Sequence, residues 1–168
     1  MELRQATCSD IEVLMRIFDG AKKIMRESGN LTQWDRMYPT RDVVMSDISG
    51  GYCHVLCDGD EIIGTMALIP GPETTYEVIE GEWPNEDPYY VIHRIAAPVP
   101  GRNVAEAMLD WAFGHIATNG CRTIRIDTHS DNCIMKHVLD KYGFVQCGII
   151  WLDDGAPRDA YVKSKQES

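Results

Sequence analysis

The chain has 168 residues, of which 44% are hydrophobic and 25% charged, and its formal net charge is −10 at pH 7. This length suits one domain with one core, so we expect residues 1–168 to form a single domain. The negative charge and the lack of any Lys/Arg run disfavour nucleic acid and membranes as partners. No stretch approaches the roughly 20 apolar residues of a membrane span, and the N-terminus shows no secretory signal pattern. We therefore expect a soluble, cytoplasmic protein.

The cysteines include no C-x-x-C pair and no neighbouring histidine at metal-ligand spacing. Cys53 and Cys57 share one face of a predicted strand but are separated by two steps of about 6.6 Å, too far for an unstrained disulfide. We predict reduced, mostly buried thiols and no metal site. The six are Cys8, Cys53, Cys57, Cys121, Cys133 and Cys147.

The first half of the chain predicts a strand, two helices and a hairpin. A short strand at residues 3–6 precedes an amphipathic helix that begins near Ser9 and ends at Gly29. A shorter helix is predicted at 41–48. Strands at 53–57 and 61–69 flank Asp58-Gly59-Asp60, which is typical of an antiparallel hairpin because glycine accepts positive φ.

The second half alternates strands with helices. Residues 70–88 are rich in proline, glycine and acids, which predicts a surface excursion with little regular structure. The apolar and aromatic run at 89–96 is typical of a central strand covered on both faces. A helix at 102–119, a strand at 123–128, a helix at 131–142 and strands at 144–152 and 159–163 follow. This order predicts an α/β (α+β) domain with a mixed sheet.

This order of elements resembles the GNAT superfamily of N-acetyltransferases over nearly the whole chain. Three segments carry the likeness: the strand at 90–96, the loop at 100–105 where the family binds pyrophosphate, and the helix at 132–144 that ends in Tyr-Gly-Phe. The resemblance implies about seven strands, about four helices on both faces, and a sheet splayed between the fourth and fifth strands. It also implies acetyl-CoA as cosubstrate and direct acetyl transfer to a primary amine.

The predicted pyrophosphate loop departs from the family pattern, which is Arg or Gln, two free positions, Gly, one free position, then Gly or Ala. Here Pro100 takes the first place and Asn103 replaces the central glycine. Free amides at a helix N-terminus bind phosphate without lysines, and asparagine tolerates left-handed backbone. We expect a weakened but retained CoA site, with an ordinary strand-to-helix turn as the alternative. Its predicted residues are Gly101, Arg102, Asn103, Val104 and Ala105.

The resemblance assigns three further residues to the cosubstrate. Ile95 and Ala97, on the splayed strand, would donate backbone N–H groups to the thioester and pantetheine region. Asn132 looks like the family's side-chain contact to pantetheine. It could equally cap the helix that follows it, and both interpretations stay open.

Direct transfer needs a group that accepts the amine proton, and the departing thiolate benefits from an acid. Many family members use a tyrosine in their fourth helix as this acid. Alignment on Tyr142-Gly143-Phe144 places Leu139 there, while core packing explains Tyr142 better. The usual acid is therefore absent.

We predict His93 as the base, because imidazole titrates near neutral pH and this strand borders the acetyl site. A packed, structural His93 is the main alternative. Glu80 or Glu82 acting through water, and His129, are the other candidates.

In this family the acceptor usually lies between the first two helices and the loop before the fourth strand. Aromatic residues in those segments, with Glu80, Glu82, Glu86 and Asp87 nearby, would favour a small or cationic amine or a peptide N-terminus. Each aromatic residue could instead belong to a local core. The predicted lining residues are Gln33, Trp34, Tyr38, Trp83 and Tyr89.

Two rival interpretations remain. A catalytically retired GNAT fold would bind acyl-CoA or a partner protein without turnover, as the altered loop and the missing tyrosine would allow. A flavodoxin-like binding module is disfavoured by the predicted antiparallel hairpin. Homodimers are common in the family, and the sequence leaves the oligomeric state and the acceptor open.

Overall fold

The computed structural model describes residues 1–99 and 101–166, so Pro100 of the predicted pyrophosphate loop lies outside the described residues. The α-helices are α1 (Ile11–Glu27), α2 (Arg41–Ser49), α3 (Val104–Thr118) and α4 (Cys133–Tyr142). The strands are β1 (Glu2–Gln5), β2 (Cys53–Asp58), β3 (Glu61–Pro70), β4 (Ile79–Gly81), β5 (Tyr89–Ala96), β6 (Thr123–Thr128), β7 (Val145–Trp151) and β8 (Pro157–Ser164).

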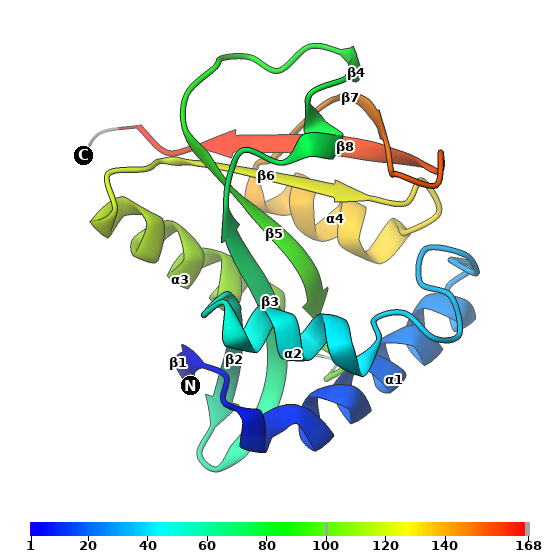
Figure 1. The fold of residues 1–168 in the computed structure, drawn as a ribbon, viewed down its shortest axis with the longest axis vertical. Coiled ribbons are helices and arrows are strands. Elements are labelled where there is room, and N and C mark those ends of the chain that lie inside the picture. Colours follow the sequence, from blue (N-terminus) through cyan, green and yellow to red (C-terminus); the bar gives the residue numbers. More distant parts are fainter. Residues whose placement is uncertain (100, 167–168) are drawn as a thin grey trace.

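All eight strands form one mixed sheet in the order β1-β2-β3-β5-β6-β8-β7-β4 (Figure 1). β5 and β6 are parallel, and the other six neighbouring pairs are antiparallel. The predicted fold class and the predicted order of elements are confirmed, with β4 as an additional strand. The hairpin is confirmed as well, because Asp58 pairs with Glu61 across a two-residue loop in which Gly59 has φ of 61°.

The segment between β3 and β5 is more ordered than predicted. It contains a 3₁₀ turn (Thr74–Tyr76) and β4, which pairs with β7, and Tyr76 is buried. β4 approaches β7 closely where Gly81 faces Gly148, both at positive φ. The composition of this segment is typical of turns and therefore did not predict β4, whose partner β7 lies far along the chain.

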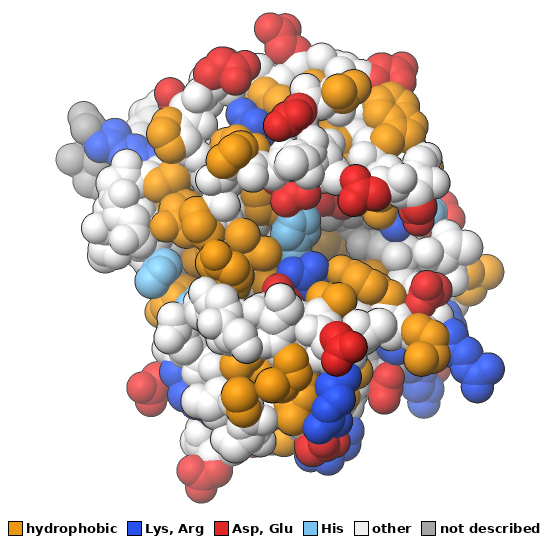
Figure 2. All heavy atoms as spheres, in the orientation of Figure 1, with side chains coloured by type: hydrophobic (Ala, Val, Ile, Leu, Met, Phe, Trp, Pro, Cys, Tyr) orange, Lys and Arg blue, Asp and Glu red, His pale blue; other side chains and the backbone are white. Residues whose placement is uncertain are grey.

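Three hydrophobic clusters divide the core between the two faces of the sheet. Alternate residues of a strand point to opposite faces, so Leu56 and Ile92 pack beneath α3 and α4, whereas Val55 packs beneath α1 and α2. Val91 belongs to a third cluster with Tyr76, beneath the 71–88 segment. Figure 2 shows the face that carries α1, α2 and the 71–88 segment, which is hollowed in the middle, where a histidine side chain lies.

The six cysteines are free thiols, but the prediction that they are mostly buried is wrong. Cys53 and Cys121 are buried, Cys57 and Cys147 are partly exposed, and Cys8 and Cys133 are exposed. Residues 1–99 and 101–166 contain no cluster of three or more side chains that could hold a metal ion. Within the same residues, no helix is long and apolar enough to cross a membrane.

β5 separates from β6 after its first three residues. The parallel register covers Tyr89 to Val91 only, while β5 runs on beside β3 to Ala96 (Figure 1). Five residues of β5 therefore have no strand partner on the β6 side. The predicted splay between these strands is confirmed.

A β-bulge at Arg94 coincides with this separation. Between the pairs Ala67–His93 and Thr65–Ala96, β5 contains one residue more than β3, and Arg94 takes a left-handed backbone with φ of 49°. Bulges bend a strand and increase its local twist. The bulge therefore turns the end of β5 away from the plane that β6 follows.

The Arg94 side chain joins this bulge to α2. Its Nε and Nη2 donate to the two carboxylate oxygens of Asp47 at 2.6 and 2.7 Å, and its Nη1 donates to the Tyr38 hydroxyl at 3.0 Å. The Arg94 and Asp47 side chains are only 14% and 11% exposed. Removing one partner of such a pair leaves a buried charge without compensation.

We expect Asp47→Ala to lower the free energy of unfolding by about 3 kcal/mol, because it leaves the Arg94 guanidinium buried and unpaired. Adding Arg94→Met should then recover part of the loss. Urea unfolding of the two single variants and the double variant gives the coupling energy of the pair. Strictly additive effects would show that the two residues do not depend on each other.

We expect Gly81→Ala to lower the free energy of unfolding by about 2 kcal/mol, because its Cβ would come within 2.1 Å of the Cys147 carbonyl oxygen. Gly114→Ala is the matched control. It lies in α3 with open space around its Cβ, so helix propensity predicts a gain of up to about 1 kcal/mol. Denaturant unfolding measures both, and a loss of equal size in the two variants would contradict the close packing of β4 on β7.

Candidate active site

His93 lies on the part of β5 that has left β6, and it faces Glu73. His93 Nε2 is 3.5 Å from Glu73 Oε2, and the two side chains are 22% and 26% exposed. The other Glu73 oxygen accepts a hydrogen bond from the Thr75 hydroxyl at 2.9 Å, and the Glu73 backbone N–H donates to the Tyr89 hydroxyl at 2.9 Å. The His93 imidazole and the Thr75 hydroxyl hold the pKa of the Glu73 carboxyl at about 2, against the opposing effect of burial. Glu73 was not among the residues predicted from the sequence.

The other predicted bases are placed differently. Glu80 and Glu82 are exposed at the edge of the sheet, where Glu80 pairs with Ile149 of β7. His129 Nδ1 accepts from the backbone N–H of Asp131 at 3.0 Å. Its Nε2 must then carry the proton and donate to the Thr32 hydroxyl at 3.1 Å. Both ring nitrogens of His129 therefore have hydrogen-bond partners within the protein, and Nδ1 also lies 3.7 Å from the Asp131 carboxylate.

Leu139, which occupies the position of the family's tyrosine acid, belongs to the hydrophobic core. It lies on α4 and is fully buried in the cluster that α4 shares with α3 and the sheet. The Tyr142 hydroxyl donates to Asp110 of α3, and its ring is stacked on Phe113 with centroids 6.1 Å apart. Burial and the Asp110 carboxylate both raise the pKa of Tyr142. Tyr142 therefore packs against α3, as the sequence analysis favoured.

The residues predicted to line the acceptor surface do not share one surface. Trp34 is 9% exposed and packs edge-on against Phe18 in the cluster beneath α1 and α2, with centroids 5.7 Å apart. Trp83 and Tyr89 cover the Arg125 guanidinium at 4.2 and 4.0 Å. Trp34 therefore lies in a local core, whereas Trp83 and Tyr89 are partly buried and line one cavity with Glu86 and Asp87, so their assignment to the acceptor stays a prediction.

The acidic residues predicted to lie near the acceptor do not surround His93 either. Glu86 and Asp87 lie with Arg125 around a cavity of about 520 Å³ near the beginning of β5. That part of β5 still pairs with β6. The acidic residues of the 71–88 segment therefore do not gather around the histidine, apart from Glu73.

Tyr38 and Gln33 lie closer to the diverging strands. Tyr38 accepts from Arg94, the neighbour of His93. Gln33 Oε1 accepts from the side-chain amide of Asn132 at 2.8 Å, and its own amide lies 3.4 Å from the Thr128 hydroxyl at the end of β6. These contacts bring the α1–α2 connection to the ends of β5 and β6.

Asn132 caps α4. Its Oδ1 accepts from the backbone N–H of Met135 at 3.0 Å, and the residue is 6% exposed. Of the two interpretations of Asn132, the helix cap is confirmed, and the contact to pantetheine stays a prediction.

The predicted pyrophosphate loop leads into α3 through two left-handed residues, Gly101 with φ of 78° and Asn103 with φ of 50°. The first intrahelical bond is donated by the Ala107 N–H to the Asn103 carbonyl. The Arg102 guanidinium pairs with Asp58 at 2.7 Å, and both side chains are 47% exposed. The charge of Arg102 is thus already partnered within the protein.

Glu106 places a carboxylate in the first turn of α3. Its contacts with its own backbone N–H and with Lys141, at 3.1 Å, lower the pKa of this carboxyl. With Arg102 and Glu106 both paired, the loop offers an anion the partial charges of helix amides rather than a free cation.

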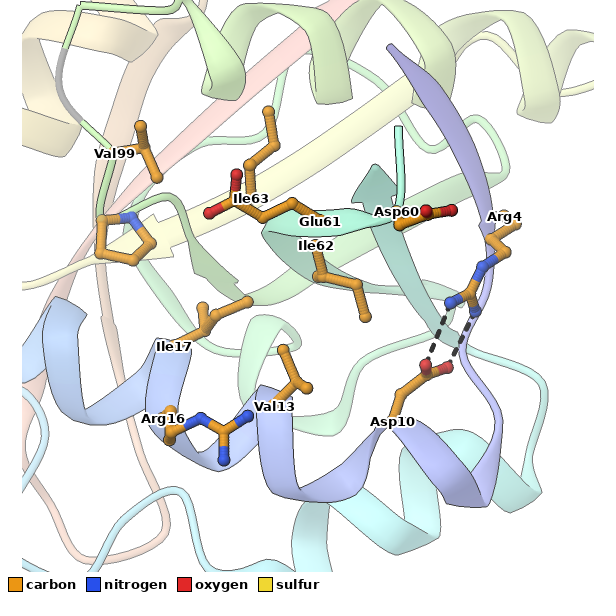
Figure 3. Close-up of a pocket in the computed structure, with 11 residues that line it drawn as sticks. Arg4, Asp10, Val13, Arg16, Ile17, Asp60, Glu61, Ile62, Ile63 and Val99 are labelled. Atoms are coloured by element: carbon orange, nitrogen blue, oxygen red, sulfur yellow. Dashed lines mark hydrogen bonds and ion pairs between the residues drawn. The ribbon is translucent and has the colours of Figure 1, made fainter. Parts of the chain in front are cut away.

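A second cavity, of about 540 Å³, lies between α1, the β2–β3 hairpin and Val99 (Figure 3). Arg4 and Asp10 form a bidentate ion pair beside it, at 2.8 and 3.0 Å. The Arg4 guanidinium holds the pKa of the Asp10 carboxyl at about 2. Neither His93 nor Glu73 lines this cavity.

Known proteins share this architecture. Residues 21–144 match the family model for the acetyltransferase (GNAT) family. A GNAT-family acetyltransferase from Streptococcus agalactiae is 32% identical, with a TM-score of 0.87 over 99% of this chain and 96% of that one. No curated protein matches the chain.

Two more distant structures, each 14% identical, share the fold. PaiA N-acetyltransferase from Thermoplasma acidophilum, in complex with coenzyme A, has a TM-score of 0.73 over 98% of both chains. A ribosomal-protein-alanine N-acetyltransferase from Brucella melitensis has a TM-score of 0.67 over 98% of this chain and 100% of that one. By its match to the family model and its 32% identity to a solved member, the chain belongs to the GNAT family of acetyltransferases.

Proposed function

We propose that this protein transfers the acetyl group of acetyl-CoA directly to a primary amine. The observation that carries the proposal is the position of His93 on the stretch of β5 that has no strand partner on the β6 side, facing Glu73 and next to Arg94, which contacts Tyr38 of the α1–α2 connection. The coenzyme A complex of the PaiA structure supports acetyl-CoA as the cosubstrate. Acetyl-CoA supplies the activated acyl group when it is bound.

The free side of β5 and the N-terminus of α3 fit this cosubstrate. Pairing with β6 ends at Val91, so backbone groups farther along β5 remain available to pantetheine, and we assign Ile95 and Ala97 to this contact. The first amides of α3 have no intrahelical partners, and the positive end of the helix dipole favours phosphate there. We assign Gly101, Arg102, Asn103, Val104 and Ala105 to the pyrophosphate.

The chemistry assigned to the protein is proton transfer. As the neutral amine attacks the acetyl carbon and the carbon–sulfur bond breaks, His93 takes the proton that leaves the amine nitrogen, and the sulfur departs as a thiolate. With Leu139 in place of the tyrosine acid, the thiolate must leave without that acid. A thiol of pKa about 8.5 is a fair leaving group at neutral pH.

The acceptor is defined here only by its amine. The Brucella melitensis structure is that of an enzyme for a ribosomal-protein alanine, so the fold serves a peptide amine in that protein. Tyr38 and Gln33, which contact Arg94 and Asn132, are the predicted acceptor residues best placed for a small amine or a peptide N-terminus.

The second candidate function is acyl-CoA binding without turnover. Two observations favour it: Leu139 removes the usual acid, and Glu106 places a carboxylate beside the pyrophosphate loop. Acetyl transfer to any amine would exclude it.

We expect acetyl-CoA to bind with a micromolar Kd, about −8 kcal/mol, in a calorimetric titration. Asn103→Gly should bind several-fold more tightly, because glycine takes the left-handed conformation freely and allows closer approach of phosphate to the backbone. Asn119→Gly, at the other end of α3, is the matched control and should bind like the wild type. No binding at millimolar acetyl-CoA would overturn the cosubstrate, and unchanged or weaker binding by Asn103→Gly would overturn the steric role of Asn103.

We expect His93→Ala to lower kcat by about 10²- to 10⁴-fold with little change in the KM for acetyl-CoA, as is typical for loss of a general base. The acid limb of the pH–rate profile at saturating amine should disappear with it. His129→Ala should retain the wild-type profile, because both of its ring nitrogens are used structurally. An unaltered profile in His93→Ala would remove His93 from the mechanism.

A further inference from the structure

We propose that Glu73 is a positioning residue, which holds the His93 imidazole in the tautomer that leaves Nδ1 free to accept the amine proton. The inference rests on the proposed function, because it assigns a role to His93 in that reaction. It adds a residue from the 71–88 segment, outside the strand that carries the base.

The geometry fixes which ring nitrogen is held. A carboxylate can only accept hydrogen bonds, and Glu73 Oε2 faces Nε2 at 3.5 Å. A neutral imidazole carries one proton, so a proton kept on Nε2 leaves the lone pair on Nδ1. Contacts between catalytic groups are often long in the absence of substrate and shorten when it binds.

Glu73 is itself held in place. The Thr75 hydroxyl donates to Oε1, and the Tyr89 hydroxyl accepts from the Glu73 N–H. Tyr89 in turn accepts from the Gly71 N–H through its carbonyl, and the Arg125 guanidinium covers its ring. A solvated surface glutamate would not need these contacts, whereas a carboxylate that orients another group does.

The other groups around His93 do not compete for this role. The Tyr76 ring lies 6.4 Å from the imidazole, and its hydroxyl donates to Asp127 at 2.7 Å. On the α2 side, the charge of Arg94 is paired with Asp47. Of the acidic residues in these contacts, Glu73 alone faces the imidazole.

The pair has a defined proton balance. The amine proton moves to Nδ1 as the carbon–nitrogen bond forms, which produces an imidazolium between the acetyl site and the Glu73 carboxylate. The carboxylate stays ionised and stabilises that cation, as in other carboxylate–histidine pairs. The imidazolium then returns the proton to the departing thiolate or to water, so free CoA thiol and the amide are the products.

The test compares Glu73→Gln with Glu77→Gln, a matched change at an exposed position of the same segment. The first readout is the ¹⁵N NMR spectrum of the His93 ring at alkaline pH, which does not depend on activity. We expect a single Nε2–H tautomer in the wild type and in Glu77→Gln. Glu73→Gln should give a mixture, because an amide can both donate and accept.

The second readout is kinetic. Glu73→Gln should lower kcat by about 10- to 100-fold, a part of what a positioned base contributes, while KM for acetyl-CoA changes less than about twofold. Thr75→Ala, which frees one Glu73 oxygen, should shift both readouts in the same direction and serves if Glu73→Gln does not fold.

The outcomes distinguish a failure of the role assigned to Glu73 from a failure of the proposed acetyl transfer. An Nδ1–H tautomer in the wild type, or identical spectra in wild type and Glu73→Gln, would overturn the role of Glu73 whether or not the enzyme turns over. An Nε2–H tautomer that depends on Glu73, in a protein that acetylates no amine, would support the pairing and overturn the proposed function instead.

Discussion

The bidentate ion pair between Arg94 and Asp47 is the interaction on which the rest of the site depends. It links the bulge of β5 to α2, so the strand that leaves β6 is held by a helix on the opposite side. The free stretch of β5 presents His93, and the same guanidinium holds Tyr38 of the α1–α2 connection. One buried ion pair therefore ties the bulged end of β5 to α2, and the same guanidinium ties it to the connection beside it.

The net charge of −10 would oppose an anionic cosubstrate unless local groups outweigh it. Around the pyrophosphate loop, Arg102 and Glu106 are each paired with a residue of opposite sign. What remains is the helix dipole and the free amides of α3, whose effect falls off within the first turn. In the proposed function, such a site would attract phosphate at short range without depending on the overall field of the protein.

Much of the fold was predictable because it follows from local periodicity and turn chemistry, as in the Asp58-Gly59-Asp60 hairpin. β4 was not, since its pairing depends on Gly148, far along the chain. The burial of Trp34 was not predictable for a related reason: a tryptophan in a connection could line a surface or a local core, and only the tertiary structure shows that it packs on Phe18. Glu73 could have been found from Gly71-Pro72, a turn that keeps the chain beside β5. That Glu73 faces His93 is known only from the tertiary structure.

The two candidate histidines are also alike in the sequence and differ only in the tertiary structure. By residue type, His93 and His129 are equally suited to accept a proton near neutral pH. The structure separates them by their contacts. A backbone N–H donates to Nδ1 of His129, whereas the Glu73 carboxylate faces Nε2 of His93, and in the proposed tautomer the lone pair on Nδ1 stays free. Because Leu139 replaces the tyrosine acid, no second titrating group of that kind assists the reaction. Under the proposed function, the rate would then depend on how well one imidazole is oriented, and the 71–88 segment supplies the carboxylate that faces it.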